Sequence, residues 1–348
     1  MKLDKENGNT LWYDAIQKEM KNVRVAFQVW EEGDVDDAKR GQKLVGYQQI
    51  RCHMIFDIKM DGRFTRKARF VAGGHTTDTP SSITYSSVVS RDSVRIAFTI
   101  AALNDLDIRA ADIGNAYLNA PCREKIWTIA GTEFGSDKGK VLLICRALYG
   151  LKSSGAAWRL MFAETLRNFG YTSSKADPDV WMKAETKPDG NEYYSYVLVY
   201  VDDLLHLHHN PDLLMQEIEK IYRLKEGSVG EPDRYLGANI DKVQLEDGGI
   251  VWSMTSMTSK EYLTNAIKNL EDTLEKDGVS PLKVFGKKSG ERPFPSNYRP
   301  ELDVSPVLNE EMQSRYLQLI GILRWAIELG RIDIITEVSV LSQHQCHP

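Results

Sequence analysis

The stretch Tyr196-Val-Leu-Val-Tyr-Val-Asp-Asp-Leu-Leu-His-Leu207 constrains the fold more than any other part of the chain. A run of β-forming residues leads to two adjacent carboxylates, Asp202 and Asp203, and a second apolar run leads away, which predicts a strand, a tight turn and a returning strand. No glycine is present, although Asn-Gly or Asp-Gly would suit a two-residue hairpin loop. A turn that breaks this local rule suggests a function, and paired carboxylates at a strand tip suit a hard cation such as Mg²⁺. The alternative is an ordinary surface turn with hydrated carboxylates.

Composition places the chain among ordinary globular proteins. Its 348 residues predict two or three domains with room for a buried core. The polar start at residues 1–6 lacks a signal peptide, and no stretch is apolar for long enough to span a bilayer, so we expect no membrane partner. The scattered cysteines lack CxxC spacing, which argues against a zinc site or a disulfide framework and fits a reducing compartment; they are Cys52, Cys122, Cys145 and Cys346.

The net charge of −5 does not by itself suggest a nucleic-acid partner, which would favour a basic balance. Basic residues nevertheless gather between positions 51 and 95. A net-acidic protein can therefore present one basic face, with the expected members Arg51, Lys59, Arg63, Arg66, Lys67, Arg69, Arg91 and Arg95.

Local patterns in the N-terminal part predict a helix followed by a hairpin. Residues 11–23 place apolar side chains on one face of a helix, with Thr10 as its N-terminal cap. Short apolar runs at 50–58 and 69–71 flank an Asp-Gly turn at 60–63, which predicts an antiparallel pair whose second strand is basic.

The stretch 106–118 predicts a strand that ends near Asp112, then a turn through Gly114-Asn115 into a short helix. A carboxylate at a strand end, with backbone N–H groups just behind it, can bind a metal on one side and a phosphate on the other. The alternative is that Asp112 only caps the helix.

Residues 147–155 form a Gly-punctuated loop that opens a helix with Trp158 and Phe162 on one face and Gly170 as its stop. The loop offers backbone donors and Lys152, a plausible cradle for a polyphosphate or a nucleic-acid backbone. An ordinary helix N-terminus is the alternative.

The remaining patterns predict helices at 91–103, 211–224 and 310–329, strands at 126–129, 141–145, 235–240 and 249–254, a helical region from 258 and a linker near 280–305.

Three carboxylates at strand ends, Asp112 and the adjacent pair Asp202 and Asp203, suggest phosphoryl transfer assisted by two metal ions, which lie roughly 3.5–4 Å apart in such sites. Mg²⁺ suits the site because it prefers hard oxygen ligands. The basic strand at 66–69 could stabilise the charge that develops on the phosphoryl oxygens.

Ordered motifs along the chain resemble one family. Tyr200-Val-Asp-Asp203 resembles the signature of reverse transcriptases, and its surroundings resemble the copia type of long-terminal-repeat retrotransposon. Each match is weak alone, but the ordered set is specific. The others are Lys67-Ala-Arg-Phe-Val-Ala72, Asp112-Ile-Gly-Asn-Ala-Tyr-Leu118, Leu148-Tyr-Gly-Leu-Lys152 with Ala157-Trp158, Ala176-Asp177, Tyr235-Leu-Gly237, and Tyr316-Leu-Gln-Leu-Ile-Gly321 with Leu341-Ser-Gln343.

The resemblance implies an α+β fold, a right-hand polymerase with fingers, palm and thumb, in which an antiparallel palm sheet packs on helices. It assigns residues 1–105 to fingers with part of the palm, 106–240 to a palm with the catalytic motifs, and 241–348 to a thumb-like or connection-like region, without protease, integrase or ribonuclease H domains. The implied activity is that of an RNA-directed DNA polymerase that copies a retrotransposon RNA by two-metal nucleotidyl transfer. The implied partners are an RNA template, a DNA or RNA primer, dNTPs and other parts of the pol polyprotein, in the cytoplasm or within virus-like particles.

The resemblance makes Asp112, Asp202 and Asp203 the ligands of two Mg²⁺ ions, with Mn²⁺ as a substitute. Tyr117 matches the family's sugar-sensing position, where a bulky ring would clash with a ribose 2′-hydroxyl. Simple core packing is the alternative for this ring.

Further residues are implied to contact the nucleotide. Either Lys67 or Arg69 would contact the triphosphate, and Gly150, Lys152 and Tyr200 would line the pocket. Lys225 lies where the family often has a lysine that could protonate the pyrophosphate leaving group, although a solvated lysine is the alternative.

The chain departs from the family pattern mainly around the nucleotide and template grip. Gln-Ala-Pro-Arg is replaced by Ser153-Ser-Gly-Ala156, Lys-Gly-Phe by Gly73-Gly-His75, Ser-Pro-Val by Ser86-Ser-Val88, and Lys-Trp-Val-Phe by His53-Met-Ile-Phe56. The metal ligands are intact, so these losses bear on turnover. Because the other domains of such a polyprotein are missing, we expect a processed, truncated or decayed piece of a larger reading frame.

Two other kinds of site fit less well. The run 197–203 resembles a Walker B strand, but residues 135–141 have the wrong spacing for its phosphate loop and lack the hydroxyl after the lysine. His206, His208 and His209 suggest a metal cluster, but strand alternation puts His209 on the opposite face from the other two.

The main alternative is a catalytically weak or decayed polymerase fold that acts as a nucleic-acid-binding or interaction domain. The three intact carboxylates favour the enzyme. The altered grip residues and the negative net charge favour the alternative.

Overall fold

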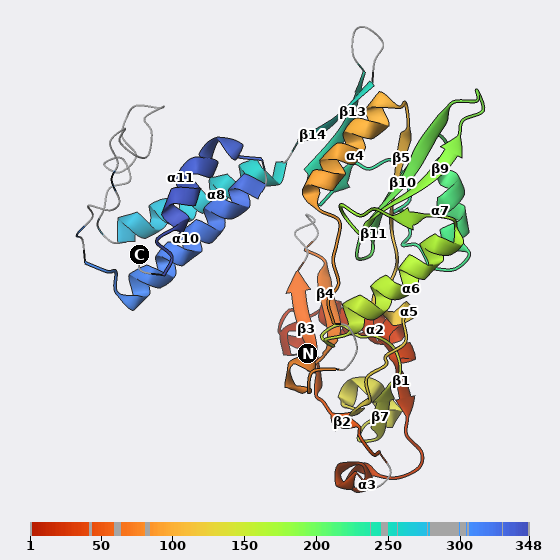
Figure 1. Ribbon diagram of the computed structural model, residues 1–348. Coiled ribbons are helices and arrows are strands. Elements are labelled where there is room, and N and C mark those ends of the chain that lie inside the picture. The colour runs from red at the N-terminus through yellow and green to blue at the C-terminus, as the bar shows by residue number, and fades with distance from the viewer. Residues whose placement is uncertain are drawn as a thin grey trace. The chain divides into compact units, whose positions relative to one another are not determined.

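The computed structural model divides the chain into two compact units, residues 1–232 and 233–348 (Figure 1). The residues that the structure describes are 2–41, 44–58, 64–80, 84–236, 238–244, 250–255, 257–276, 278, 299, 304, 306–328 and 330–346. The predicted turn at 60–63, most of the predicted linker at 280–305, and Lys59, Arg63 and Gly237 lie outside them.

A five-stranded antiparallel sheet of order β5-β11-β10-β9-β8 forms the centre of the first unit. Its central strands form the predicted hairpin, and Val197, Leu198, Leu204, Leu205 and Leu207 on them have no exposed surface. Burial on both faces explains why their sequence is a continuous apolar run rather than an alternating one. The strands are β5 (Asp107–Asp112), β8 (Thr172–Ser173), β9 (Val180–Thr186), β10 (Glu192–Tyr200) and β11 (Asp203–His208).

Three helices pack against this sheet: α4 (Arg91–Leu103), α6 (Ser154–Asn168) and α7 (Asp212–Glu219). The side chains of Trp158 and Phe162, one helical turn apart on α6, enter one hydrophobic core with α7 and the strands of the hairpin. The helix α4 contacts β11 directly. The sheet is therefore covered by helices whose apolar positions recur at helical spacing.

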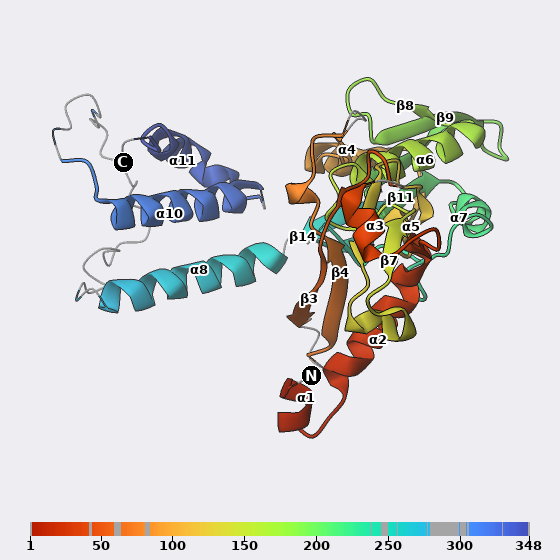
Figure 2. The same ribbon diagram turned by 90° about the horizontal axis from the view of Figure 1, so that it is seen from below.

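The N-terminal part of this unit packs a helix against a hairpin. Helix α2 (Leu11–Val23) lies along β4 (Arg66–Ala72), which pairs with β3 (Cys52–Ile58) (Figure 2). Alternation along β4 buries Phe70 in the core and leaves Arg69 exposed on the opposite face. This alternation directs Lys67 and Arg69 away from the core, whereas Arg66 shares the face of Phe70 and lies over the Trp12 ring of α2, 5.5 Å from its centroid.

A four-stranded sheet of order β1-β7-β6-β2 adds to the same core. The rings of Phe27, Phe70 and Phe134 meet edge to face there, with centroids 5.1 to 5.8 Å apart. The strands are β1 (Phe27–Val29), β2 (Gln48–Gln49), β6 (Ile126–Ile129) and β7 (Val141–Ile144). The short helices of this unit are α1 (Lys2–Glu6), η1 (Arg24–Ala26), α3 (Val35–Arg40), η2 (Gly74–Thr76), α5 (Ala116–Asn119) and η3 (Thr132–Asp137).

The second unit holds a small sheet and a set of helices. The sheet has the order β12-β13-β14, and α10 packs on α11, where the Tyr316 hydroxyl donates to the carbonyl of Leu341 at 2.6 Å. Over the part of the chain that the structure describes, no helix is both long and apolar enough to cross a membrane. Its elements are β12 (Arg234–Tyr235), β13 (Ala238–Gln244), β14 (Ile250–Thr255), α8 (Met257–Lys276), α10 (Glu310–Glu328), η5 (Ile332–Ile334) and α11 (Ile335–Ser342).

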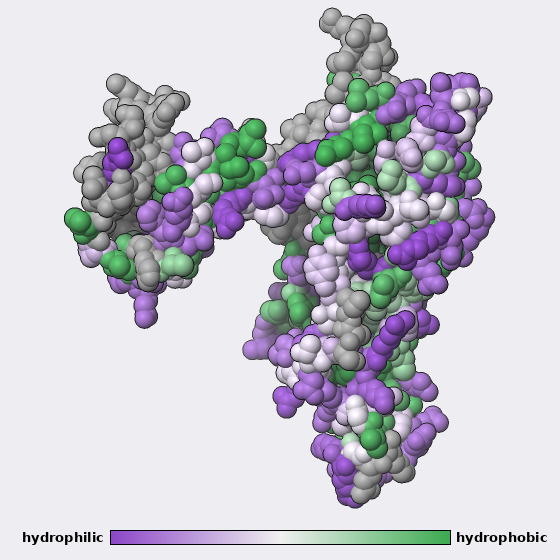
Figure 3. Space-filling model, viewed as in Figure 1, coloured by the Kyte–Doolittle hydropathy of each residue, from purple (hydrophilic) through white to green (hydrophobic). Residues whose placement is uncertain are grey.

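Hydrophilic side chains dominate the visible face of the larger unit, and apolar atoms form separate groups on it (Figure 3). The outer face of α4 carries two of the exposed apolar side chains, Ile96 and Leu103. Scattered exposure of this kind is ordinary for folded proteins.

The sequence predicted the class and several elements correctly. The α+β class and the antiparallel sheet packed on helices are confirmed, and the helices predicted at 11–23 and 91–103 coincide with α2 and α4. The division at 232 places residues 233–240, assigned to the palm from the sequence, in the second unit. The fingers, palm and thumb divisions themselves stay predictions.

Thr10 does not cap α2 as predicted. Its hydroxyl donates to the carboxylate of Asp14 at 2.8 Å instead. The backbone N–H groups of Trp12 and Tyr13 donate to the buried carboxylate of Asp4, at 3.1 and 2.9 Å. A side chain outside the helix therefore satisfies the free N–H groups of its first turn.

The helix predicted at 211–224 ends early, at Glu219. The following residues leave the helix because they hydrogen-bond to the end of β5. The N–H of Gly114 donates to the carbonyl of Arg223, and the N–H of Lys225 donates to the carbonyl of Asp112, both at 2.9 Å.

Candidate active site

The predicted hairpin forms with a two-residue turn. Tyr200 pairs with Asp203 at the ends of β10 and β11, which leaves Val201 and Asp202 as the turn. Val201 has φ +59°, in the left-handed region that a β-branched residue rarely adopts. The prediction of an ill-suited turn is therefore confirmed.

The register of the sheet brings Asp112 to this hairpin. β5 pairs with β11 so that Asp112 lies directly opposite Asp203. Directly opposite residues of an antiparallel pair project from the same face, with Cβ atoms about 4.5–5.5 Å apart. The backbone N–H of Asp112 donates to the hydroxyl of Ser228 at 3.1 Å, so Asp112 ends its strand and does not cap α5.

The three carboxylates repel one another in a half-buried site. Burial raises the pKa of Asp203 to about 6, and the charges of Asp202 and Asp112 add to this shift. Burial likewise raises the pKa of Asp202, again with a contribution from Asp112. A nearby positive charge would stabilise all three as carboxylates.

Lys225 supplies one such charge. Its ammonium donates to Oδ2 of Asp112 at 2.5 Å, and this hydrogen bond is the main cause of a raised pKa at Lys225. Lys225 is therefore paired with a carboxylate while it stays exposed to solvent, and its role as a proton donor stays a prediction.

The donor set fits a hard divalent cation in its chemistry. Three carboxylates at strand ends offer the oxygen ligands that Mg²⁺ prefers. As the side chains stand, however, no three Asp, Glu, His or Cys residues within the described ranges are gathered closely enough to hold one ion. Lys225 bonds Oδ2 of Asp112, so a metal held by this carboxylate would bind through Oδ1 or displace the lysine.

Two aromatic rings and an arginine lie beside the carboxylates. The rings of Tyr117 and Tyr149 have centroids 4.7 Å apart, and the Arg69 guanidinium lies 5.5 Å from the Tyr149 centroid. Burial raises the pKa of Tyr149 to about 12 and also raises that of Tyr117, with the charge of Asp202 adding to both shifts. The predicted sugar-sensing residue therefore lies within the electrostatic field of the carboxylates.

Tyr149 was not predicted as a site residue. It lies inside the motif at 148–152, in which the sequence indicated the glycine and the lysine. Only the folded structure shows that its ring lies between Tyr117 and Arg69. Of the two basic candidates on β4, Arg69 is the one whose charge acts on Asp202, and both Arg69 and Lys67 act on Glu19. A triphosphate contact of either residue stays a prediction.

The loop at 147–155 docks on the end of β4. The N–H of Ala72 donates to the carbonyl of Tyr149 at 2.7 Å, and Gly150 has φ +93°. A Cβ at Gly150 would lie 2.1 Å from the carbonyl oxygen of Ala72, and one at Gly74 would lie 2.3 Å from that of Gly150. Glycine is required at both positions because the two backbones touch.

Lys152 and Ser153 make hydrogen bonds to residues of two other segments of the chain. The Lys152 ammonium donates to the carbonyl of Thr77 at 2.5 Å, and the N–H of Ser153 donates to the carboxylate of Glu124 at 3.2 Å. Strand pairing brings Tyr200 to Asp203, whereas the Lys152 ammonium is bonded to Thr77 and not to a residue of the hairpin. A nucleotide contact of Lys152 stays a prediction.

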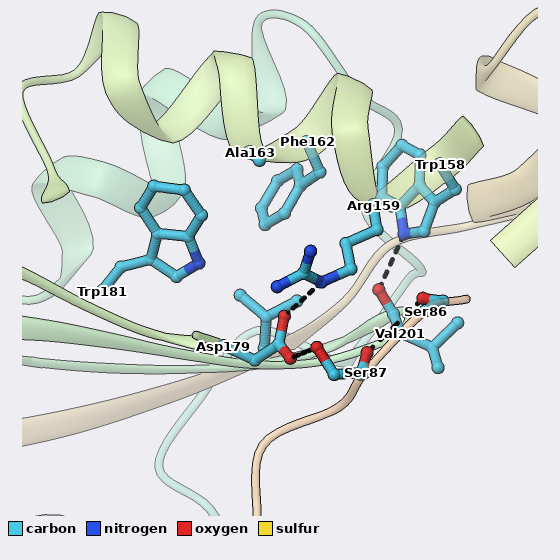
Figure 4. A pocket seen from close by; sticks show the side chains of 10 residues that line it. Ser86, Ser87, Trp158, Arg159, Phe162, Ala163, Asp179, Trp181 and Val201 are labelled. Carbon is cyan, nitrogen blue, oxygen red and sulfur yellow. Dashed lines mark hydrogen bonds and ion pairs between the residues drawn. The ribbon is translucent and has the colours of Figure 1, made fainter. Parts of the chain in front are cut away.

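Two of the altered segments contact each other. A Cβ at Gly155 would lie 3.2 Å from Cβ of Ser86, and the hydroxyl of Ser87 donates to the buried carboxylate of Asp179 (Figure 4). Arg159 binds the other oxygen of Asp179 at 2.8 Å. Ser86, Ser87, Arg159 and Asp179 line one pocket together with Trp158 and Val201.

Of the three histidines at the end of the hairpin, His206 and His208 are buried. His206 is buried and makes hydrogen bonds with the Tyr171 hydroxyl at 3.0 Å and the Pro211 carbonyl at 2.8 Å. The prediction that His209 faces away from His208 is wrong, because β11 ends at His208 and the two rings are 4.3 Å apart. Among the described residues no metal-binding group includes them.

Comparisons with known proteins agree with the motifs. The profile of the family described as reverse transcriptase (RNA-dependent DNA polymerase) matches residues 29–282. The Retrovirus-related Pol polyprotein from transposon TNT 1-94 of Nicotiana tabacum is 24% identical over 317 residues, covering 87% of this chain and 22% of that protein. The Transposon Ty1-DR1 Gag-Pol polyprotein of Saccharomyces cerevisiae is 25% identical over 350 residues, covering 97% of this chain and 18% of that protein.

The chain thus spans about a fifth of the length of these curated relatives. Among solved structures, a foamy viral protease-reverse transcriptase in complex with ds DNA has a TM-score of 0.42 and 14% identity, covering 91% of this chain and 41% of that one.

Proposed function

We propose that this chain, which belongs to the reverse transcriptase (RNA-dependent DNA polymerase) family, is an active RNA-directed DNA polymerase of the copia type. The observation that carries the proposal is the register that sets Asp203 opposite Asp112, with Asp202 in the adjoining turn. Three mutually repelling carboxylates beside Arg69 and Tyr117 suit the transfer of a nucleotide to a primer 3′-hydroxyl.

Asp112, Asp202 and Asp203 would hold two Mg²⁺ ions, for which Mn²⁺ can substitute. These ions would supply charge stabilisation at the attacking and leaving oxygens. Lys225, whose ammonium lies beside Asp112, would give a proton to the pyrophosphate oxygen as the phosphoryl bond breaks.

The other residues select and orient the nucleotide. Arg69 would bind the triphosphate, and the backbone at Gly150, with Lys152 and Tyr200, would line the pocket. The ring of Tyr117 is held by Tyr149 at 4.7 Å. A ring fixed in this way would exclude a ribose 2′-hydroxyl and favour deoxynucleotides.

The proposed partners are an RNA template, a DNA or RNA primer, dNTPs and other parts of a pol polyprotein. The names of the relatives, a Pol and a Gag-Pol polyprotein of transposons, support this context. Location in the cytoplasm, including virus-like particles, belongs to the same proposal.

Primer extension on an RNA template with dNTPs and Mg²⁺ or Mn²⁺ tests the function. Asp202→Asn should abolish incorporation, because it removes a charged ligand and retains the shape. Asp189→Asn is the matched control, since Asp189 lies in the exposed turn between β9 and β10. Equal activity of Asp202→Asn and the wild type would contradict the proposal.

A second candidate is a nucleic-acid-binding domain without turnover. The bonds of Lys225 to Asp112 and of Lys152 to Thr77 favour it, because they engage within the protein two lysines that the resemblance assigns to the nucleotide. Template binding without any incorporation, with either metal, would support this candidate over the enzyme.

A further inference from the structure

The turn that carries Asp202 is held from outside in a conformation that its own residues do not favour. Val201 has φ +59°, and a β-branched side chain in this region is strained. Such a conformation persists only when surrounding contacts determine it.

Two hydrogen bonds hold the turn. The indole Nε1 of Trp158 donates to the carbonyl of Val201 at 2.8 Å, as Figure 4 shows. The N–H of Ile113 donates to the carbonyl of Asp202, also at 2.8 Å. The first bond comes from α6, and the second comes from the residue after Asp112, so both carbonyls of the turn are fixed.

The indole of Trp158 is itself immobilised by packing. Its side chain is buried and stacks on Phe162 with a centroid distance of 5.3 Å and an interplanar angle of 21°. The ring of Tyr222 meets it edge-on at 5.3 Å, and the Tyr222 hydroxyl bonds the hydroxyl of Thr165 at 2.7 Å. Rings packed in this way prevent the indole N–H from turning away from Val201.

The ring of Trp158 also supports, through Tyr222, the chain segment that bonds to the end of β5 at Asp112. Tyr222 leads directly into the segment whose Arg223 carbonyl accepts from Gly114 and whose Lys225 N–H donates to Asp112, both at 2.9 Å. Trp158 therefore contacts both chain segments that place the carboxylates, the hairpin turn through its N–H and the Tyr222 segment through its face.

We propose that Trp158 is a positioning residue whose indole N–H sets the place of Asp202 relative to Asp112. Its catalytic consequence rests on the proposed polymerase function, whereas its effect on the hairpin does not. Trp158 touches no reacting atom in this role and acts through the Val201 carbonyl.

The test compares Trp158→Phe with Trp181→Phe in the full chain. Both changes remove an indole N–H from the same hydrophobic core, but Trp181 lies on β9 and packs its ring under Arg167 at 5.4 Å. Hydrogen–deuterium exchange of the segment 196–207 should become at least about tenfold faster in Trp158→Phe, as expected for the loss of one hydrogen bond, and stay unchanged in Trp181→Phe.

Primer extension should fall by about tenfold to a hundredfold in Trp158→Phe, because a small displacement of a catalytic group has that effect. Adding Val201→Gly should recover most of this loss, since glycine adopts a positive φ without strain. A structural role alone would not predict rescue by a glycine in the turn.

Each outcome decides the inference. Equal hairpin exchange in the two phenylalanine variants overturns it, as does failure of the glycine to rescue extension. If the wild type extends no primer, the proposed function fails, and the exchange comparison still decides the role of Trp158. If Trp158→Phe does not fold, the indole proton of Trp158 in the wild type decides, because rapid exchange of that proton with solvent overturns the bond.

Discussion

Two turns beside the carboxylates adopt a positive φ by opposite means. In the loop at 147–155 the residue is Gly150, at φ +93°, and glycine suits that conformation. In the hairpin the residue is Val201, at φ +59°, which does not suit it. The loop is therefore specified by its own sequence, whereas the hairpin is specified by Trp158 and Ile113, which hold its carbonyls.

This difference shows where a local pattern suffices. The glycine also permits the contact of the loop with Ala72, so one residue sets both the conformation and the docking. The valine contributes neither, and the turn depends on partners that lie far away in the sequence. The loop should therefore be sensitive to its own residues and the hairpin to its surroundings.

The largest expected effect is that of Gly150→Ala. The added Cβ would lie 2.1 Å from the Ala72 oxygen and would strain a positive φ, so the free energy of unfolding should fall by about 3 kcal/mol. Gly190→Ala is the control, because Gly190 has φ +86° with no atom within 4 Å of an added Cβ, and should cost about 1 kcal/mol. Denaturant unfolding measures both, and equal losses would show that the close approach has no effect.

Tyr117→Ala tests the ring that lies between the loop, where it packs on Tyr149, and the hairpin, where the charge of Asp202 acts on it. Without it, discrimination against ribonucleotides should fall by about a hundredfold, since the clash with the 2′-hydroxyl disappears. Relative incorporation of a ribonucleotide and its deoxynucleotide measures this ratio. Tyr117→Phe keeps the ring and should keep the discrimination; unchanged discrimination in Tyr117→Ala would remove this residue from the sugar-sensing role.

The far end of the hairpin should respond to acid. Burial lowers the pKa of His206 to about 3, with smaller contributions from His208 and Lys183. Below about pH 6.5 the unfolded chain takes up a proton that folded His206 does not, so the free energy of unfolding falls by roughly 1.4 kcal/mol per pH unit from this group. Above that pH the group has no effect.

Denaturant unfolding between pH 6.5 and 4.5 should show a shallower slope in His206→Gln than in the wild type. His75→Gln, at an exposed position, is the control and should keep the wild-type slope. Identical slopes in all three proteins would mean that His206 takes up its proton in the folded state.

The smallest effect is that of Val201→Gly alone. Relief of the strained φ is opposed by the added chain entropy of glycine and by the lost packing of the half-buried valine, so the free energy of unfolding should change by less than about 1 kcal/mol. Val199→Gly, two residues earlier in β10, should lower stability by more than this, because it removes a buried side chain. Equal losses in Val201→Gly and Val199→Gly would show that the Val201 side chain, and not the outside hydrogen bonds, holds the turn.

Much of the fold follows from local patterns, and part of the site does as well. Helical spacing located α2, α4 and α6, and the run at 196–207 located the hairpin with Asp202 and Asp203. The pairing of Asp203 with Asp112 depends on strand register between distant segments, which periodicity does not encode. The ordered motifs predicted only that these carboxylates belong to one site.

Other features could not be predicted because they arise from neighbours in space. The bond between Lys225 and Asp112 forms because residues after α7 return to β5. Tyr149 packs on the Tyr117 ring, and the N–H groups at the start of α2 bond to Asp4, which precedes the helix, and not to Thr10.

The backbone contact between β4 and the loop at 147–155 has a mechanical consequence. With Gly74 and Gly150 in direct contact and Ala72 hydrogen-bonded to Tyr149, a displacement of β4 would displace the backbone of the loop with it. Arg69 and Tyr149, which these two segments carry, would then move in the same direction relative to the carboxylates on the central sheet.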